Sequence, residues 1–235
     1  MDEIKNKKVY VKEKFSRVTR RYDLVNTLGS FGIDHWWRYR TIKELKRLPG
    51  PILDLCAGTL TLAKEIVRQR PRQVVALDIT YEMLAYGKVR LARHPALSFI
   101  TQVAGDAESL PFKDDSFWGA SVAFGIRNLA NPEKGLAEII RVLKPRGKLA
   151  VLEFSRPKVP IFKQVYHLYL NHFMPLLGGT LTGDEEAYQY LAKSIAKFPA
   201  PEEFARMMQR AGFKEIKFYP LTFGIVTVYT GVKPL

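Results

Sequence analysis

The chain has 235 residues, of which 47% are hydrophobic and 26% are charged, a composition that excludes a mainly disordered or fibrous protein. The 37 Lys and Arg residues exceed the 23 Asp and Glu residues and give a formal net charge of +14. Cys56 is the only cysteine, so the chain forms no internal disulfide, and no apolar run reaches the roughly 18 residues that cross a bilayer. The first residues lack the apolar core of a signal peptide, so the sequence predicts a cytoplasmic protein.

Residues 1–50 form the most basic part of the chain, with 13 basic and 6 acidic residues. Aromatic residues are interleaved with these charges, which favours a helical surface that approaches anionic lipid. We therefore expect a basic N-terminal helical region that contacts the inner face of the membrane peripherally. Nucleic acid is not expected as a partner, because the chain contains no zinc-finger spacing and no RNA-binding aromatic signature.

Residues 51–150 alternate short apolar segments with helical ones. Continuous apolar strands that are separated by helices indicate a parallel sheet covered on both faces. Strands are predicted at residues 51–56, 73–78, 97–103, 119–124 and 147–154, and helices at 61–70, 80–93 and 131–143.

The alternation breaks after Phe154. Residues 157–200 are too long for a simple connection and predict a mostly helical insertion. A helix at 202–211 then ends at Gly212, and strands at 213–219 and 222–232 are close enough to pair as an antiparallel hairpin. The sequence therefore predicts an α/β fold with a mostly parallel seven-stranded sheet.

Polar and small residues follow the first three predicted strands. Asp54 and Gly58 stand at the turn after the first strand, Asp78 ends the second, and Asp106 follows the third. Ligands of open α/β sheets bind beyond the carboxyl ends of the strands, where a carboxylate accepts ribose hydroxyls. This order predicts an adenosine site.

The turn after the first strand indicates which adenosine cofactor is bound. It contains one glycine, Gly58, where a dinucleotide fingerprint has three, and it has no Gly-Lys-Ser/Thr sequence. A cofactor without phosphates, S-adenosylmethionine, therefore fits better than NAD or ATP. The four histidines and Cys56 lack the spacing of metal ligands, so no metal site is expected.

The motifs of this chain resemble those of the ubiquinone/menaquinone biosynthesis C-methyltransferase family. The resemblance covers nearly the whole chain. It is carried by Tyr22-Asp-Leu-Val-Asn26, Gly105-Asp-Ala-Glu108, Phe124-Gly-Ile-Arg-Asn128, Arg141-Val-Leu-Lys-Pro145 and Leu221-Thr-Phe-Gly-Ile-Val226. It implies the Rossmann-like class I methyltransferase fold over residues 51–235, with a substrate-side insertion at about 157–200.

The resemblance also implies methyl transfer from S-adenosylmethionine to a ring carbon of a polyprenylated benzoquinol or naphthoquinol. Arg127 and Asn128 match the segment that faces the substrate, and an Arg there stabilises a developing phenolate or orders a water that accepts the proton. The expected cofactor-binding residues are Asp54, Gly58, Thr59, Asp78, Asp106, Ala107 and Ala123. The expected substrate-binding residues are Tyr22, Arg127, His167, Tyr188 and Tyr190.

Leu60 is the main departure from the family pattern, because the family usually has a glycine there. Its side chain must point away from the cofactor, displace it or fill part of its site. A second interpretation is therefore a relative that has lost catalysis and binds a quinone lipid or partner proteins. A third is methylation of another small molecule or of RNA. Pairing of copies through the sheet edge or the insertion would give a homodimer.

Overall fold

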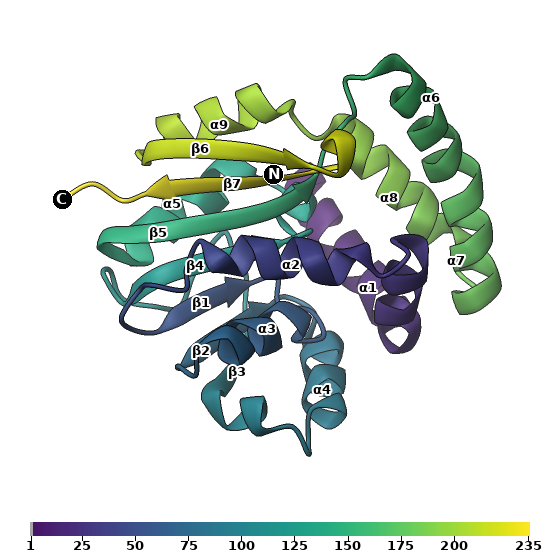
Figure 1. The fold of residues 1–235 in the computed structure, drawn as a ribbon. Helices are drawn as coiled ribbons and strands as arrows, with labels where there is room; N and C mark the ends of the chain where they lie inside the picture. The colour runs from purple at the N-terminus through teal and green to yellow at the C-terminus, as the bar shows by residue number, and fades with distance from the viewer. Residues whose placement is uncertain (1) are drawn as a thin grey trace.

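The computed structural model describes the backbone of residues 2–235 and the side chains of residues 7–235 (Figure 1). Seven strands form one sheet in the order β3-β2-β1-β4-β5-β7-β6. The first five strands are parallel, whereas β7 is antiparallel to β5 and β6. The predicted mostly parallel sheet with an antiparallel C-terminal hairpin is confirmed. The strands are β1 Ile52–Leu55, β2 Val74–Asp78, β3 Ile100–Ala104, β4 Phe117–Ala123, β5 Leu143–Phe154, β6 Lys214–Leu221 and β7 Val226–Val232.

Three predicted strand starts are wrong. The last strand begins at Val226 instead of 222, because Thr222–Gly224 forms a 3₁₀ helix. Leu97–Phe99, assigned to the third strand, belongs to a 3₁₀ helix over Pro95–Phe99. Pro95 occupies the first turn of that helix and the His94 ring caps it by accepting from the Ala96 N–H, so the strand starts only at Ile100. The fifth strand begins at Leu143 instead of 147, because Leu143 already pairs with Phe117 of β4.

Helices cover both faces of the sheet. One apolar core lies between the sheet and α5 and α9, and a second lies between the sheet and α2, α3 and α4. Amphipathic helices bury one side against a sheet because that removes apolar surface from water. These helices are α2 Ile33–Lys43, α3 Thr61–Gln69, α4 Tyr81–Arg90, α5 Pro132–Val142 and α9 Pro201–Arg210.

The insertion is helical, as the sequence predicts. It contains α6 Pro160–Leu168, a π-helical segment over Tyr169–Phe173, α7 Met174–Thr182 and α8 Glu185–Lys197. These elements stand at the right of Figure 1 and share a third core with α1 Asp2–Gly29 through Val25, Tyr166 and Tyr188. The α7–α8 contact is close at Gly178, where an added Cβ would lie 2.1 Å from the Tyr188 ring.

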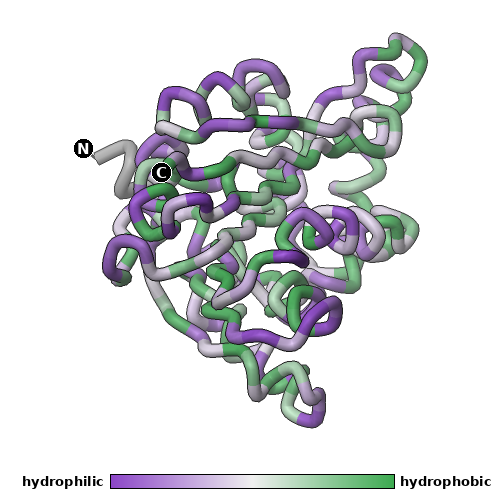
Figure 2. Tube along the Cα trace, turned by 60° about the vertical axis from the view of Figure 1, so that its left-hand side comes forward, coloured by the Kyte–Doolittle hydropathy of each residue, from purple (hydrophilic) through white to green (hydrophobic). Residues whose placement is uncertain are grey.

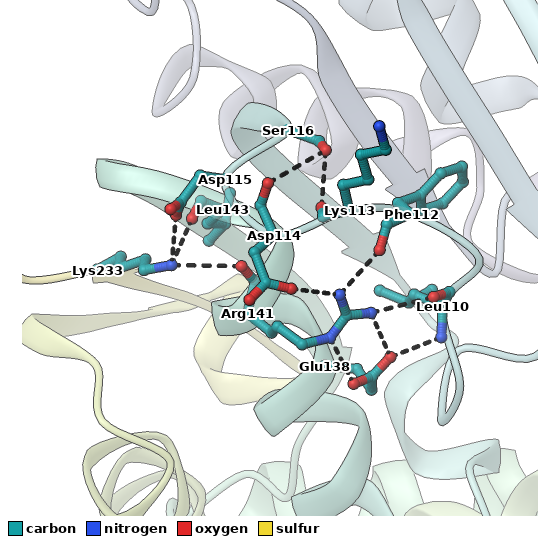
Figure 3. Close-up of polar contacts among 10 residues, drawn as sticks. All are labelled: Leu110, Phe112, Lys113, Asp114, Asp115, Ser116, Glu138, Arg141, Leu143 and Lys233. Atoms are coloured by element: carbon teal, nitrogen blue, oxygen red, sulfur yellow. Dashed lines mark hydrogen bonds and ion pairs between the residues drawn. The ribbon is translucent and has the colours of Figure 1, made fainter.

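A polar cluster fixes the loop between β3 and β4 (Figure 3). Arg141, in the last turn of α5, donates to the carbonyls of Leu110 and Phe112 at 3.0 and 2.8 Å, and it forms ion pairs with Glu138 and Asp114. The Glu138 carboxylate in turn accepts from the Leu110 N–H at 2.7 Å. The family-like Arg141 motif therefore positions the loop that carries Asp106.

None of the helices described over residues 2–235 has both the length and the apolar character needed to cross a bilayer.

Candidate functional site

The carboxyl ends of four parallel strands surround a cavity of about 90 Å³. It lies where the strand order changes direction between β1 and β4, which is the usual ligand site of an open α/β sheet. Its walls are the segments 56–59, 78–80, 105–108 and 123–125, with side chains of α1 above them. We call it the strand-end cavity.

Asp78 organises the floor of the strand-end cavity. Its Oδ2 accepts from the Gly58 N–H and its Oδ1 from the Thr80 N–H, both at 2.8 Å. Burial raises the pKa of the Asp78 carboxyl, and the hydrogen bonds from Thr80 and Gly58 act in the opposite direction. Each oxygen retains acceptor capacity, so the carboxylate can accept the two hydroxyls of a ribose.

Asp106 and Glu108 form the far wall of the same cavity. The Asp106 Oδ1 accepts from the Glu108 N–H at 2.9 Å, and Lys8 of α1 lies 2.6 Å from Asp106 Oδ2 and 2.8 Å from Glu108 Oε2. Glu108 Oε1 also accepts from the N–H groups of Ala130 and Asn131. The first part of α1 is thus tied to this wall.

Leu60 points away from the strand-end cavity. It has a left-handed backbone with φ 66° at the start of α3, and its side chain is fully buried in the core with Ile42, Leu45 and Leu84. Gly58 and Thr59 line the cavity, whereas Leu60 does not. Leu60 therefore does not occupy the strand-end cavity, which agrees with the first of the three outcomes left open by the sequence.

A second, larger cavity of about 400 Å³ lies beside the first and is almost entirely apolar. Side chains of α1, α2 and the helices of the insertion line it. Tyr22, Arg127, Tyr188 and Tyr190 are among them, so four of the five expected substrate residues come together here. We call it the apolar cavity.

The two cavities meet at four residues that line both of them. These residues are Phe15, Tyr22, Arg38 and Phe124. Phe124 has a left-handed backbone, with φ 59°, directly after β4. Strained residues of this kind are frequent at binding sites, where the surrounding structure holds them in place.

Arg127 is buried at the wall of the apolar cavity. Its Nη1 lies 2.8 Å from Glu153 Oε1 and also contacts the Phe124 carbonyl, while its Nε donates to Ser194 Oγ at 3.3 Å. Burial raises the pKa of Glu153, and the Arg127 charge acts against that shift. The pair fixes the orientation of the guanidinium.

Three further residues of the predicted site take different positions. Asn128 lines the strand-end cavity, and its Oδ1 accepts from the Tyr190 hydroxyl at 3.2 Å, so it connects the two cavities. Asp54 lies below the cofactor turn, lines neither cavity and accepts from Ser121 Oγ at 2.7 Å. His167 is exposed on α6 and also lines neither cavity, so the structure does not bring it to the substrate.

The remaining predicted cofactor residues lie together. All of them line the strand-end cavity: Gly58, Thr59, Asp78, Asp106, Ala107 and Ala123.

A family model described as the ubiE/COQ5 methyltransferase family matches residues 1–233. The chain belongs to this family. A demethylmenaquinone methyltransferase of Desulfitobacterium hafniense is 40% identical over 233 residues, which cover 98% of this chain and 92% of that protein. A protein of Syntrophotalea carbinolica, named ubiquinone/menaquinone biosynthesis C-methyltransferase UbiE, is 43% identical over 94% of this chain and 93% of its own length.

Solved structures agree with the fold of this ubiE/COQ5 family member. A S-adenosylmethionine-dependent methyltransferase of Thermotoga maritima superposes with a TM-score of 0.66 at 21% identity, covering 94% of this chain and 99% of the other. Phosphoethanolamine N-methyltransferase 2 of Haemonchus contortus, in complex with S-adenosyl-L-methionine, gives 0.60 at 16% identity over 87% of this chain and 57% of the other. The expected class I methyltransferase fold is confirmed.

Family membership makes the chain a S-adenosylmethionine-dependent methyltransferase. The polar groups of the strand-end cavity fit that cofactor, because the Asp78 carboxylate can accept hydrogen bonds from the ribose hydroxyls. The Leu60 side chain is directed away from the cavity. The volume is smaller than the roughly 300 Å³ of a usual small-molecule site. Lys8, Val11 and Phe15 of α1 line one side of it.

The sequence alone did not identify every residue at this site. Phe15 and Arg38 lie at the junction of the cavities, and Lys8 and Asp23 join α1 to the cofactor loops. Asp34 and Arg38 stand four residues apart in an aromatic-rich segment, a spacing that places opposite charges on one helix face. The spacing of Asp34 and Arg38 could be read from the sequence, but the sequence did not indicate that this helix face points toward the cavities.

Proposed function

We propose that this methyltransferase transfers the methyl group to a ring carbon of a polyprenylated naphthoquinol or benzoquinol. Two of its relatives are named demethylmenaquinone methyltransferase and ubiquinone/menaquinone biosynthesis C-methyltransferase. The observation that carries the proposal is the apolar cavity of about 400 Å³ that meets the strand-end cavity at Phe15, Tyr22, Arg38 and Phe124. An aromatic ring held at that junction lies next to the cofactor, while a hydrocarbon tail has an apolar space to occupy.

The cofactor, when bound, supplies an activated methyl group, so the chain has to align the acceptor and make its ring carbon nucleophilic. Loss of the phenolic proton to a water molecule makes the ring carbon nucleophilic, and the methylated carbon then releases its own hydrogen as a proton when the ring becomes aromatic again. Tyr22, Tyr188 and Tyr190 line the cavity and orient the ring, and Phe124 packs against Phe154 at 4.5 Å between ring centres to form an aromatic wall. Closely packed apolar walls exclude water from the reacting atoms.

Arg127 stabilises the developing phenolate in this proposal. Its Nη1 and Nε are engaged by Glu153, Phe124 and Ser194, which leaves Nη2 for the acceptor. A guanidinium remains protonated at physiological pH, so Arg127 acts as a hydrogen-bond donor and not as the base. Asn128, held by Tyr190, is the neighbouring polar group on the cofactor side.

We further propose that the chain is cytoplasmic and docks on the membrane that contains its substrate. The docking surface is an apolar rim, in which the most exposed side chain is 79% accessible and the least is 62%: Phe31, Ile161, Val165, Leu168, Leu176 and Phe223. Phe31, Val165 and Phe223 also line the apolar cavity, so these three residues connect the rim to the cavity. A quinol could then pass from lipid to the cavity without crossing water.

The charge around the apolar rim suits anionic lipid. Residues 157–182 contain Lys158 and Lys163 and no acidic residue, and residues 1–50 carry a surplus of +7. In this proposal residues 1–50 are a basic helical region that contacts the membrane, and residues 51–235 are the methyltransferase domain. A homodimer is the competing use of the rim, in which a second copy covers the apolar side chains in place of lipid.

The function is tested with purified protein and S-adenosylmethionine that carries a labelled methyl group. The acceptors are demethylmenaquinol, a prenylated methoxybenzoquinol lacking the ring methyl, and RNA. We expect label on the ring carbon of one or both quinols and none on RNA. Cofactor binding without label in any quinol would overturn the proposal and favour a relative that only binds the lipid. Label in RNA would favour the third interpretation.

A further inference from the structure

Arg38 of α2 is the one charged residue among the four that line both cavities. It is 7% exposed, and its guanidinium lies 5.2 Å from the centre of the Phe124 ring. A cation that is removed from water and packed on an aromatic ring is strongly attracted to any anion that enters the same space.

The guanidinium of Arg38 lacks hydrogen-bond acceptors among the side chains described for residues 7–235. Its Nε lies 3.5 Å from Asp34 Oδ2, which is an ion-pair distance, but the geometry does not make a hydrogen bond. None of the hydrogen bonds found in this part of the chain is donated by its terminal nitrogens. The Nε of Arg38 is a buried donor without a hydrogen-bond partner, which is costly, and the two terminal nitrogens carry four further N–H donors for a ligand.

Asp34 fixes where the Arg38 guanidinium lies. Asp34 is 5% exposed and its Oδ1 accepts from Ser30 Oγ at 3.0 Å, while its backbone N–H donates to the same hydroxyl. The pair therefore occupies one face of α2 with a fixed geometry. The arrangement neutralises the charge only partly, since the single contact to Asp34 is long.

We propose that Arg38, positioned by Asp34, binds an oxyanion at the junction of the two cavities. The proposal rests on the proposed function for the nature of that oxyanion. Two groups with this chemistry meet at the junction: the phenolate oxygen of the acceptor ring and the carboxylate of the cofactor's methionine portion. Arg127 is a second guanidinium close to this junction: burial raises the pKa of Tyr22, and the charges of Arg127 and Arg38 both act against that shift.

The test compares Arg38→Gln with Arg40→Gln, a change of the same type on the same helix at a residue that lines neither cavity. Arg38→Lys and Asp34→Asn test whether charge or orientation matters. Thermal unfolding establishes that each variant is folded. Three probes are titrated by calorimetry or absorbance: S-adenosylhomocysteine, 5′-methylthioadenosine, which lacks the carboxylate, and 4-methoxy-1-naphthol, whose ultraviolet spectrum reports ionisation.

If the oxyanion is the carboxylate, Arg38→Gln lowers the affinity for S-adenosylhomocysteine about tenfold or more and leaves the affinity for 5′-methylthioadenosine unchanged. If it is the phenolate, the bound naphthol ionises about one pH unit higher in Arg38→Gln than in wild type. Arg38→Lys restores part of either effect, Asp34→Asn shows part of it, and Arg40→Gln shows neither. The other ionisable groups around the junction remain in both glutamine variants: Tyr22, Asp34, Asp54, Asp78, Arg127, Glu153 and Tyr190.

The proposal is overturned if a folded Arg38→Gln binds all three probes, and ionises the naphthol, as wild type does. A failure of the proposed function is seen separately, as the absence of quinol methylation by the wild-type protein. In that case the probe titrations still decide whether Arg38 binds an oxyanion, because none of them depends on methyl transfer.

Discussion

The protonation of Asp54 depends on its buried position beneath the site. It is fully buried at the end of β1, where its Oδ1 accepts from Ser121 Oγ, and Oδ2 has no partner among the described side chains. Burial raises the pKa of Asp54 to about 7, and the Ser121 hydrogen bond and Arg38 charge act against that shift. Its carboxyl is therefore often protonated in the folded protein near neutral pH, whereas it is ionised in the unfolded chain.

The Asp54 shift predicts how stability depends on pH. Between about pH 4 and pH 7 the folded state holds a proton that the unfolded chain has released, so this group's contribution to stability falls as pH rises through that window. Asp54→Asn cannot titrate, so we expect its free energy of unfolding to lose less between pH 5 and pH 8, by about 3 kcal/mol or less. Urea unfolding at both pH values measures the difference.

Asp115→Asn is the control for the Asp54 experiment, because Asp115 is an exposed carboxylate whose ion pair with Lys233 lies at the surface. Its pH dependence should follow wild type. Parallel curves for wild type and Asp54→Asn would show that Asp54 is ionised in the folded protein.

Leu60 has two opposing effects on stability. Its left-handed backbone is strained for a leucine, yet its side chain fills the core beside Leu84. Replacing it with glycine relieves about 1 kcal/mol of backbone strain but removes a buried side chain. We therefore expect the free energy of unfolding of Leu60→Gly to be about 2–4 kcal/mol lower than that of wild type. Because the leucine does not line the strand-end cavity, affinity for S-adenosylhomocysteine should change no more than about twofold.

The matched control for Leu60 is Leu62→Ala, which removes a buried side chain from the same core without altering the cofactor turn. Chemical unfolding and calorimetry are done on both variants. A gain of cofactor affinity of about tenfold in Leu60→Gly alone would mean that the natural leucine obstructs the site.

At the scale of elements, the loop from Gly105 to Ser116 depends on α5 for its shape. Arg141 binds two carbonyls of this loop, and the loop carries Asp106 and Ala107 at the strand-end cavity (Figure 3). Arg141→Gln should lower the affinity for S-adenosylhomocysteine about three- to tenfold. It should lower the free energy of unfolding by only about 1–2 kcal/mol, because the Arg141 side chain is partly exposed and solvent screens its ion pairs.

Arg210→Gln serves as the comparison for Arg141, since it breaks an exposed ion pair with Glu133 and Arg210 has no described hydrogen bond to the loop. It should change stability by less than about 0.5 kcal/mol and leave affinity unaltered. Equal affinity in Arg141→Gln and wild type would contradict a role of the cluster in holding the cofactor loop.

The succession of strands and helices along the chain was predictable because buried parallel strands are continuous apolar runs, and each predicted strand and its helix occur in the structure. Boundaries were less predictable where local and tertiary effects compete. Leu97–Phe99 is apolar enough for a strand, but the preceding His94-Pro95 pair starts a 3₁₀ turn. The early start of β5 depends on pairing with Phe117, a contact that its own sequence does not contain.

The site was predictable to the extent that it follows strand ends. Gly58, Asp78 and Asp106 are placed by topology, so their positions in sequence were sufficient. The insertion offers no such rule: Tyr188 faces the apolar cavity whereas His167 is exposed, and the sequence around them does not distinguish the two positions. Leu60 likewise required the structure, since its direction follows from a left-handed backbone.

At the scale of the whole molecule, apolar surface is unevenly distributed. In Figure 2, hydrophobic residues lie mainly in the interior of the molecule. The segment at the top of the view, at the start of α6, is hydrophobic although it lies at the edge of the molecule. The six side chains of the apolar rim are among the most exposed large hydrophobic residues described. Exposed apolar side chains in such number favour a site of contact with protein or membrane.

Lipid as the occupant of the apolar rim predicts a selective loss of membrane binding. The double variant Leu168→Ser and Leu176→Ser removes two side chains that are 62% and 70% exposed, so folding should be unaffected. Sedimentation with vesicles of anionic lipid should show binding weakened about tenfold or more, because burial of each leucine contributes roughly 1.5–3 kcal/mol. Val89→Ser, equally exposed on α4, is the control and should bind as wild type does.

The same double variant separates lipid from a second copy of the chain. If the rim were a dimer interface, the wild-type protein would sediment as a dimer without vesicles, and the variant as a monomer. With lipid as the occupant, both sediment as monomers, and the variant methylates a short-chain quinol in solution at the wild-type rate while failing on quinol embedded in vesicles. That difference arises because the rim supplies access to the apolar cavity and not its chemistry, which resides at the junction with the strand ends.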